Sequence, residues 1–306
     1  MAAATPDEAM LQRVLGVAKA AAQKAGDLMR ANKGAVAVAH TKDGDKDLVT
    51  VVDKQCEDVV RATIQEAFPD HAVLGEESVG SGSSASAAAL ESFLSQEWLW
   101  IVDPIDGTTN FVHGIPASVV SIGVAHQGTM VAGVVLDPFR EELFSATAGG
   151  GAHCNGEPIT VSAAEKGLAQ AVLAFGTGHE AEMAQTMCAG AGAVSPHCRS
   201  VRSFGSAALH LSWVACGRLT GFWELDLSSW DVSAGGLLVV EAGGRISDTR
   251  GQPYTLRTRD MVATTGVGDI HSGLLESLKS AGAHVVPFAE GNVLFPPEAK
   301  KRPRQE

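Results

Sequence analysis

The stretch that decides the fold is Trp98-Leu99-Trp100-Ile101-Val102-Asp103-Pro104-Ile105-Asp106-Gly107-Thr108-Thr109-Asn110-Phe111. Its first five residues are apolar without alternation, which predicts a strand buried on both faces that ends abruptly at Asp103-Pro104. Two carboxylates, Asp103 and Asp106, therefore leave the end of a buried strand, where an unneutralised charge is costly. A hard cation such as Mg²⁺ prefers carboxylate and carbonyl oxygens and would neutralise them, whereas a lone Asp-Gly pair more often marks a tight turn.

Two further acidic sites favour the metal. Glu76 and Glu77, in Gly75-Glu76-Glu77-Ser78, leave a short strand expected over residues 72–75. Asp231 lies in the first turn of a helix expected over residues 229–242, where the helix macrodipole favours a carboxylate. Taken singly, these are an ordinary solvated pair and an ordinary first-turn acid. Three acidic sites at element ends, drawn from both halves of the chain, indicate metal ions held in a cleft between two subdomains.

Patterns in the first half predict its remaining elements. Thr5-Pro6-Asp7-Glu8 indicates a capping box with Thr5 as the N-cap, and apolar residues at helical spacing follow to Met29. A second helix is expected to stop at Pro69, and Gln127-Gly128 indicates a hairpin. Residues 80–89 are almost entirely Gly, Ser and Ala, which predicts a mobile surface loop.

The second half alternates strands with helices. Strands are expected over residues 171–175, 219–224, 262–265 and 283–286, and helices over 206–217, 229–242 and 270–280. The pattern predicts layered α/β architecture in two subdomains rather than a barrel. We expect an N-terminal α+β subdomain over residues 1–155 that carries most metal ligands, and a C-terminal α/β subdomain over 156–290 with Asp231 and the substrate contacts. Residues 291–306 form a tail.

Composition limits the function. The 306 residues are 45% hydrophobic and 19% charged, and 23 basic against 35 acidic residues give a net charge of −12. An acidic globular chain is a poor candidate for nucleic-acid binding, and the basic run at residues 300–304 is expected to be a solvated tail. No apolar run approaches a membrane span. Five scattered cysteines favour a soluble protein in a reducing compartment, and the first eight residues match neither a secretory signal nor an intact transit peptide. A transit peptide removed earlier would leave no trace.

Three segments together carry a resemblance. Residues 75–78, Asp103 to Gly114 and Trp230 to Gly235 resemble, in order and separation, the three signatures of the inositol monophosphatase family. The resemblance runs from the first helix to about Val286 and is nearest to the plastid branch of plants and algae. It implies the layered α/β/α/β/α sandwich of the inositol monophosphatase and fructose-1,6-bisphosphatase type, and a homodimer.

The resemblance also implies a site with two to three Mg²⁺ ions. Glu76, Asp103 and the Ile105 carbonyl would hold the first ion; Asp103, Asp106 and Asp231 would hold the second; a third, weaker ion would sit near Glu76. Thr108, with Glu76, would orient and help deprotonate the attacking water. Asp53 would support the metal site through a hydrogen bond, and Lys42 matches a basic residue of a mobile loop beside it. The substrate contacts implied are Asp106, Gly107, Thr108, Gly205, Ser206, Ala207, Glu224 and Asp231.

We therefore expect Mg²⁺-dependent, lithium-sensitive hydrolysis of myo-inositol monophosphates by in-line attack of a metal-activated water, in the plastid stroma or the cytoplasm. The sequence holds no G-x-S-x-G or Walker A motif to supply another mechanism, and Gly176-Thr177-Gly178 lacks the third glycine of a dinucleotide fingerprint. L-galactose 1-phosphate, histidinol phosphate and phosphoadenosine phosphate stay open as substrates. A non-catalytic regulator that binds metal or phosphate is the alternative from another class; it would be expected to lack a metal ligand or Thr108.

Overall fold

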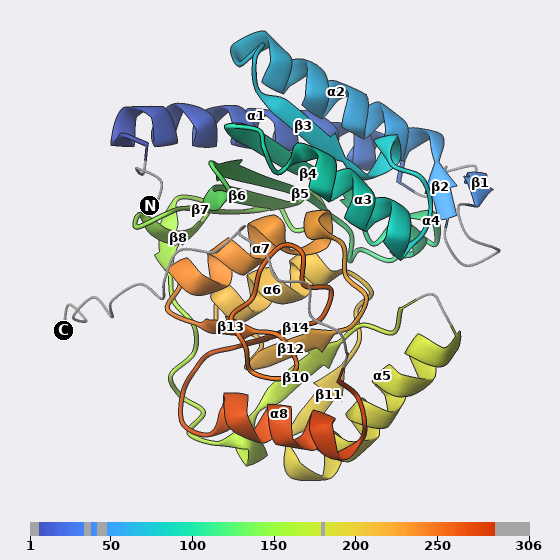
Figure 1. The fold of residues 1–306 in the computed structure, drawn as a ribbon, viewed down its shortest axis with the longest axis vertical. Coiled ribbons are helices and arrows are strands. Elements are labelled where there is room, and N and C mark those ends of the chain that lie inside the picture. Colours follow the sequence, from blue (N-terminus) through green and yellow to red (C-terminus); the bar gives the residue numbers. More distant parts are fainter. Residues whose placement is uncertain (1–5, 34–37, 42–47, 179–180, 285–306) are drawn as a thin grey trace.

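The computed structural model describes residues 6–33, 38–41, 48–178 and 181–284. Within them the chain forms five layers, α/β/α/β/α, which confirms the expected fold class (Figure 1). Lys42, the last two residues of the strand expected over 283–286, and the tail over 291–306 lie outside the described residues. No described helix is both long enough and apolar enough to cross a membrane.

The first layer consists of α1 (Glu8–Ala31) and α2 (Val51–Ala67), packed on the outer face of the larger sheet. Oδ1 of Asp7 accepts a hydrogen bond from the Met10 amide at 2.8 Å, so Asp7 is the N-cap of α1 and the prediction of Thr5 was wrong. Aspartate and threonine are both good N-caps, and here Asp7, the residue closer to the buried apolar positions of the helix, takes that position. Helix α1 ends before Asn32, as expected.

The larger sheet has seven strands in the order of the chain, with β3 parallel to β4 and every later pair antiparallel. Its hairpin turns at Gln127 and Gly128, which both have positive φ, as a two-residue type I′ turn requires. The sheet continues to Ile159, because β9 pairs with β8. Its strands are β3 (Ala72–Gly75), β4 (Trp98–Asp106), β5 (Val119–His126), β6 (Thr129–Asp137), β7 (Glu142–Thr147), β8 (Gly151–Cys154) and β9 (Glu157–Ile159).

The sequence led us to expect that strand β4 would end at Asp103-Pro104. In the structure it runs on through Pro104 to Asp106. Asp103 pairs with Ser121 and Asp106 with Val119, so three steps along β4 match two along β5, and the extra residue makes a bulge. Residues three apart on a regular strand point to opposite faces. The bulge therefore brings Asp103 and Asp106 to the same face of the sheet.

The middle layer holds α6 (Ala207–Ala215) and α7 (Ser229–Glu241), between the two sheets (Figure 1). Helix α7 packs directly on the backbone of β5 and β6, because both strands carry glycine at the contact. A Cβ on Gly123 would lie 2.4 Å from Ser233 Oγ, and one on Gly133 would lie 2.9 Å from the Ala234 carbonyl oxygen. The helix that carries Asp231 thus packs tightly on the first sheet, because a side chain at either glycine would collide with it.

The second sheet and the outer helices complete the fold. The sheet has the order β11-β10-β12-β14-β13, in which β10 is parallel to β11 and β12, and β14 is antiparallel to its neighbours. Its strands are β10 (Val172–Phe175), β11 (Ser200–Arg202), β12 (Gly221–Glu224), β13 (Arg245–Ser247) and β14 (Met261–Thr264). Helices α5 (Ala181–Val194), which the sequence analysis missed, and α8 (Ile270–Ser280) form the outer layer. The short elements are β1 (Val38–Thr41), β2 (Leu48–Thr50), α3 (Ser83–Phe93), α4 (Thr108–Val112) and the 3₁₀ turns Glu76–Ser78, Leu168–Gln170 and Ser195–His197.

Helix α3 corrects the prediction of a mobile loop over residues 80–89. Its sequence is rich in alanine, the strongest helix former, and it buries Ser86 and Leu90 against the molecule. Gly82, with φ +85°, turns the chain into the helix. Low complexity was therefore mistaken for mobility, and α3 becomes a wall of the site described next.

Candidate active site

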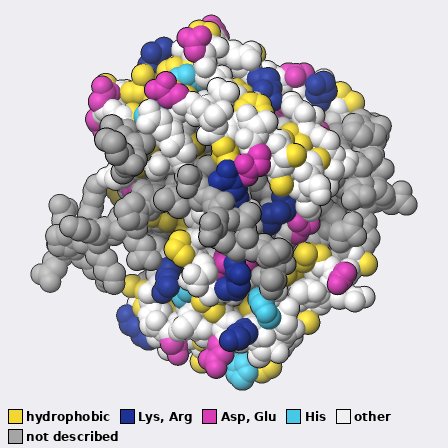
Figure 2. Space-filling model, viewed as in Figure 1, with side chains coloured by type: hydrophobic (Ala, Val, Ile, Leu, Met, Phe, Trp, Pro, Cys, Tyr) yellow, Lys and Arg dark blue, Asp and Glu magenta, His cyan; other side chains and the backbone are white. Residues whose placement is uncertain are grey.

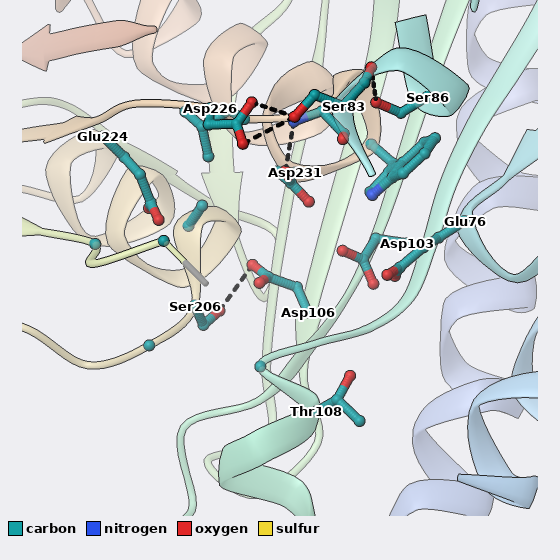
Figure 3. Close-up of a pocket in the computed structure, with 18 of the residues that line it drawn as sticks. Glu76, Ser83, Ser86, Asp103, Asp106, Thr108, Ser206, Glu224, Asp226 and Asp231 are labelled. Carbon is teal, nitrogen blue, oxygen red and sulfur yellow. Dashed lines mark hydrogen bonds between the residues drawn. The ribbon is translucent and has the colours of Figure 1, made fainter. Parts of the chain in front are cut away.

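A cavity of about 460 Å³ opens between the two halves of the molecule. Figure 3 shows Glu76 and Asp103 side by side in it. Asp106, from the same strand as Asp103, points into the same space, as do Asp231 and Glu224 from other elements. Among the described residues, its acidic lining is Glu76, Asp103, Asp106, Glu224, Asp226 and Asp231. Arg259 is the one basic side chain of the described lining. On the molecular surface that Figure 2 shows, by contrast, basic and acidic side chains are interspersed.

Strand β4 places the two central acids. Asp103 is 2% exposed and Asp106 is 9% exposed. Oδ1 of Asp103 accepts a hydrogen bond from the Ile105 amide at 3.1 Å, across the bulge. Oδ2 of Asp106 accepts from Ser206 Oγ at 2.8 Å and from the Ala208 amide at 2.6 Å, both at the start of α6. Asp106 therefore joins the first sheet to the second half of the chain.

Glu76 lies in the turn after β3, and a buried neighbour orders that turn. Oε2 of Glu57 accepts from the Glu77 amide at 2.7 Å, Oε1 accepts from the Ser78 hydroxyl, and Arg61 pairs with the same carboxylate at 2.8 Å. A Cβ on Gly75 would lie 2.4 Å from the Glu57 carboxyl carbon, so only glycine leaves room for this carboxylate. Glu57 supports the site, and the sequence analysis missed it.

Asp231 lies in the first turn of α7, as predicted. Its Oδ2 accepts a hydrogen bond from the Ser228 amide at 2.7 Å, which closes a capping box with the Ser228 side chain. The cap holds one carboxylate oxygen at the helix end and aims the group toward Asp106 (Figure 3).

Burial makes these acids hard to ionise without a counter-charge. It raises the pKa of Asp106 to about 6 and that of Asp231 to about 7, and the charge of Asp106 adds to the shift of Asp231. Burial first, and then the charge of Glu76, raises the pKa of Asp103 well above its usual range. Near neutral pH, ionising all of these groups together therefore requires a cation between them.

The donor set suits a hard divalent cation, since it consists of carboxylates and the Ile105 carbonyl. In the described part of the chain, no three His, Cys, Asp or Glu side chains are arranged so that they alone would hold one ion. Mg²⁺ sites commonly use one or two carboxylates and complete the shell with water and substrate phosphate. The residues present fit an ion of that kind, and they do not form a closed structural metal site.

Thr108 lies at the start of α4, directly after Gly107, which has φ +94°. Its Oγ1 donates toward Asp53 Oδ1 at 3.2 Å and toward the Ile105 carbonyl at 3.1 Å. Asp53 is itself fixed by Thr50, whose amide donates to Oδ2 at 2.9 Å and whose hydroxyl bonds to the same oxygen. Asp53 is therefore not part of the cavity lining, but it is hydrogen-bonded to Thr108, which is.

The other end of the cavity is shaped around Glu224, the last residue of β12. A Cβ on Gly176 would lie 1.9 Å from the Glu224 carboxylate, so this glycine makes space for the acid rather than serving a dinucleotide. Burial and the charge of Asp231 raise the pKa of Glu224 well above its usual range. Asn110 Nδ2 donates to the Phe204 carbonyl at 2.6 Å and holds the segment before Gly205 against α4.

The structure brings together almost every residue that the resemblance implied. Of those that the structure describes, all line the cavity except Asp53, which contacts it through Thr108; Lys42 lies outside the described residues. Sequence reasoning missed Ser83 and Ser86 of α3, as well as Asp226 and Arg259. The alanine-rich composition of α3 was the signal that could have placed the two serines on a helix, whereas no local pattern marks Asp226 or Arg259.

Comparisons with known proteins point to one family. The model of the inositol monophosphatase family matches residues 10–283. Inositol monophosphatase 1 of Solanum lycopersicum is 40% identical over 258 residues, or 83% of this chain and 91% of that protein. The Nus factor SuhB of Escherichia coli K12 is 41% identical over 252 residues, or 82% and 90% of the two chains. The solved structure of inositol monophosphatase from Anabaena (Nostoc) sp. PCC 7120 aligns with a TM-score of 0.74 at 35% identity, over 89% of this chain and 97% of that one.

Proposed function

The chain belongs to the inositol monophosphatase family, and from that premise we propose that it is a Mg²⁺-dependent enzyme that hydrolyses myo-inositol monophosphates to inositol and phosphate. The family is generally metal-dependent and acts on small phosphomonoesters. The observation that carries the proposal is the convergence of Glu76, Asp103, Asp106 and Asp231 on one cavity, with Thr108 at one end and Glu224 at the other (Figure 3).

The acids are the proposed metal ligands. Glu76, Asp103 and the Ile105 carbonyl would hold one ion, while Asp103, Asp106 and Asp231 would hold a second; a third, weaker ion would sit near Glu76. Water and substrate phosphate would complete these shells, because no three of the described acidic side chains are arranged to hold an ion alone. The chemistry that Mg²⁺ supplies when bound is neutralisation of phosphate charge and activation of a water for in-line attack. The bulge in β4 supports the assignment, because it turns Asp103 and Asp106 to one face of the sheet.

Thr108 is the proposed residue that orients the attacking water, together with Glu76. Its hydroxyl proton is directed toward Asp53 and the Ile105 carbonyl, so its oxygen faces other groups as an acceptor. A water that donates to Thr108 would keep a lone pair for attack on phosphorus. Asp53 keeps the Thr108 hydroxyl in that orientation and is the proposed supporting residue.

The remaining lining residues are the proposed substrate contacts. The amides of Gly107 and Thr108 would bind phosphate oxygens, and Glu224 would accept hydrogen bonds from hydroxyls of the polyol. Gly205, Ser206 and Ala207 would line the ring, with Asp106 and Asp231 nearby. A carboxylate acceptor suits a sugar-like alcohol, which carries many O–H donors and no charge.

The test is phosphate release from a substrate panel, with and without Mg²⁺ and Li⁺. The panel holds myo-inositol 1-phosphate, L-galactose 1-phosphate, histidinol phosphate, fructose 1,6-bisphosphate and phosphoadenosine phosphate. We expect Mg²⁺-dependent, Li⁺-inhibited preference for inositol 1-phosphate. A different preferred substrate refutes the substrate assignment, and turnover that is indifferent to Mg²⁺ refutes the metal assignment.

One observation favours a second candidate. The Escherichia coli relative at 41% identity is named a Nus factor, so a regulatory role without turnover is the alternative. Folded protein that binds Mg²⁺ but releases no phosphate from the panel would support it over the enzyme.

Two finer proposals rest on the family resemblance. We propose a homodimer, which light scattering after size-exclusion chromatography would test. We also propose a plastid or cytoplasmic location, which imaging of the fluorescently tagged native gene product would test.

A further inference from the structure

Four residues, Ser83, Ser86, Asp226 and Arg259, form a hydrogen-bonded group that we call the latch. Arg259 donates from Nε to Asp226 Oδ1 at 2.8 Å, from Nη2 to the Asp226 carbonyl at 3.1 Å, and from Nη1 to Ser86 Oγ at 2.7 Å. Ser83 Oγ lies 2.7 and 2.9 Å from the two oxygens of the Asp226 carboxylate. The latch therefore binds helix α3, from the first half of the chain, to the loop between β12 and α7.

That loop, residues 225–228, connects Glu224 to the cap of Asp231. Asp226 has φ +62°, a left-handed conformation that is unfavourable for a non-glycine residue. The Leu227 amide donates to the Arg259 carbonyl at 2.7 Å, so Arg259 holds the loop through both its backbone and its side chain. Five donor–acceptor contacts thus keep the loop in a shape that it would not favour alone.

The latch also lines the cavity. Residues 79–83 with Ser86, and residues 225–228, belong to its lining, and Figure 3 shows Ser83, Ser86 and Asp226 together at one edge of it. An ion pair between Glu91 and Arg257 attaches the C-terminal end of α3 to the second half of the chain. Neither of its residues lines the cavity. The chain therefore has one attachment of α3 at the cavity and a comparable one away from it.

We propose that Arg259 is a positioning residue for substrate specificity: it holds α3 against the loop after Glu224 as a rigid wall that favours a compact polyol phosphate over bulkier phosphomonoesters. The inference rests on the proposed function, because it concerns the alcohol side of that substrate. It requires the planar guanidinium, since three donors meet three separate acceptors. Lysine carries the charge but cannot reproduce that geometry.

The kinetic test compares a compact substrate, myo-inositol 1-phosphate, with a bulky one, adenosine 2′-phosphate. In Arg259→Gln and Arg259→Lys, we expect kcat/KM for the compact substrate to fall about tenfold relative to the bulky one, through KM rather than kcat. Glu91→Gln breaks the Glu91–Arg257 ion pair, which attaches the same helix away from the cavity, and should leave the ratio within about twofold. Equal losses on both substrates, a wild-type ratio in Arg259→Lys, or the same change in Glu91→Gln would each overturn the proposal.

Failure of the proposed function can be distinguished from failure of the inference about Arg259. If the wild-type protein leaves inositol 1-phosphate intact, that function is refuted, and glycerol 2-phosphate serves as the compact substrate for the same ratio. Amide hydrogen exchange supplies a readout without turnover: we expect exchange in residues 83–93 to be about tenfold faster in Arg259→Gln and Arg259→Lys than in Glu91→Gln. Unchanged exchange in both arginine variants would show that the latch does not hold the helix.

Discussion

Two glycines of the site matter because of the space they leave. The carboxylate of Glu57 lies where Gly75 would carry a Cβ, and the carboxylate of Glu224 does so at Gly176. In the sequence, Gly75 belonged to a signature and Gly176 to an incomplete dinucleotide motif. Neither reading indicated which side chain uses the space, because that side chain lies at least 18 positions away in each case.

Gly75→Ala should damage the turn that carries Glu76. The added methyl would meet both oxygens of Glu57, at 2.4 and 2.8 Å, and would push this buried carboxylate away from the Glu77 amide. We expect Mg²⁺ affinity to fall about 10- to 100-fold, the usual cost of losing support behind a metal ligand. A Mg²⁺ titration of activity measures it. Gly16→Ala, in α1 with open space around it, is the matched control and should be neutral or slightly stabilising.

Asp231→Asn should remove a proposed metal ligand with little change of shape. We expect kcat to fall by at least about a hundredfold, because the amide cannot supply the charge that balances a cation. Asp58→Asn, on the exposed face of α2, removes the same charge away from the cavity and should leave kcat unchanged. Steady-state phosphate release at saturating substrate measures both variants, and near-wild-type activity in Asp231→Asn would contradict the two-metal assignment.

Glu224→Ala should instead affect recognition of the alcohol. Its carboxylate lies at the end of the cavity away from Thr108, so we expect KM for inositol 1-phosphate to rise about tenfold or more. KM for p-nitrophenyl phosphate, which has no polyol, should change little. A parallel rise for both substrates would remove Glu224 from substrate recognition.

At the scale of elements, periodicity predicted most helices and strands, and the misses have physical causes. The bulge of β4 depends on its register with β5, which no local pattern encodes. Helix α3 was hidden by composition, since the Ala and Ser that suggested low complexity also sustain a helix that buries Leu90. The start of α1 moved by two residues because two neighbouring side chains can each cap a helix.

The docking of α8 should make stability depend on pH. His271 of α8 lies 2.9 Å from Ser247 Oγ through Nε2 and 2.9 Å from Thr264 Oγ1 through Nδ1, and burial lowers its pKa to about 4. In the unfolded chain His271 is protonated below about pH 6.5, whereas in the folded chain it is protonated only below about pH 4. Stability from His271 is therefore complete above pH 6.5 and is lost as the pH falls toward 4.

His271→Gln should remove this part of the pH dependence. Between pH 7.5 and pH 5, the wild-type free energy of unfolding should fall by about 2 kcal/mol more than that of the variant. Urea unfolding at both pH values measures the difference. Ser247→Ala, which keeps the histidine and deletes one partner, should lower stability while retaining the pH dependence. Identical pH dependence in wild type and His271→Gln would contradict the role of this group.

At the scale of the whole molecule, the site exists only where the two halves meet. Asp106 bonds to Ser206 and Ala208, about a hundred residues later in the chain, and Ser83 bonds to Asp226. The resemblance named every acidic residue of the described lining except Asp226, because it compares long segments of the chain. It did not reveal the latch, which depends on tertiary contacts between segments that have no motif of their own.

The buried acids should couple metal binding to pH across the whole protein. Because folding raises the pKa of Asp106 to about 6 and that of Asp231 to about 7, both lower the stability of metal-free protein as the pH rises from about 4 to 7. Mg²⁺ bound at the proposed site would have to displace their protons at pH 5 but not at pH 7.5.

We therefore expect saturating Mg²⁺ to raise Tm by about 5 °C at pH 7.5 and by less than half of that at pH 5. Differential scanning calorimetry of metal-free and loaded protein measures the shift. Asp231→Asn should reduce it and Asp58→Asn should not. An equal shift at both pH values would show that Mg²⁺ binds elsewhere.

The division of the cavity between the two halves has a consequence for recombination. Asp103 and Asp106 come from the first sheet and Glu76 from the turn after its strand β3, whereas Ser206, Glu224 and Arg259 come from the second half. A crossover between relatives after Ile159, where the chain leaves the first sheet, would carry alcohol preference in one fragment and leave phosphate chemistry largely in the other. In such a chimaera, α3 would come from one parent, and Asp226 and Arg259 from the other. It should therefore discriminate among alcohols only when Ser83 and Ser86 are taken from the same parent as Asp226 and Arg259.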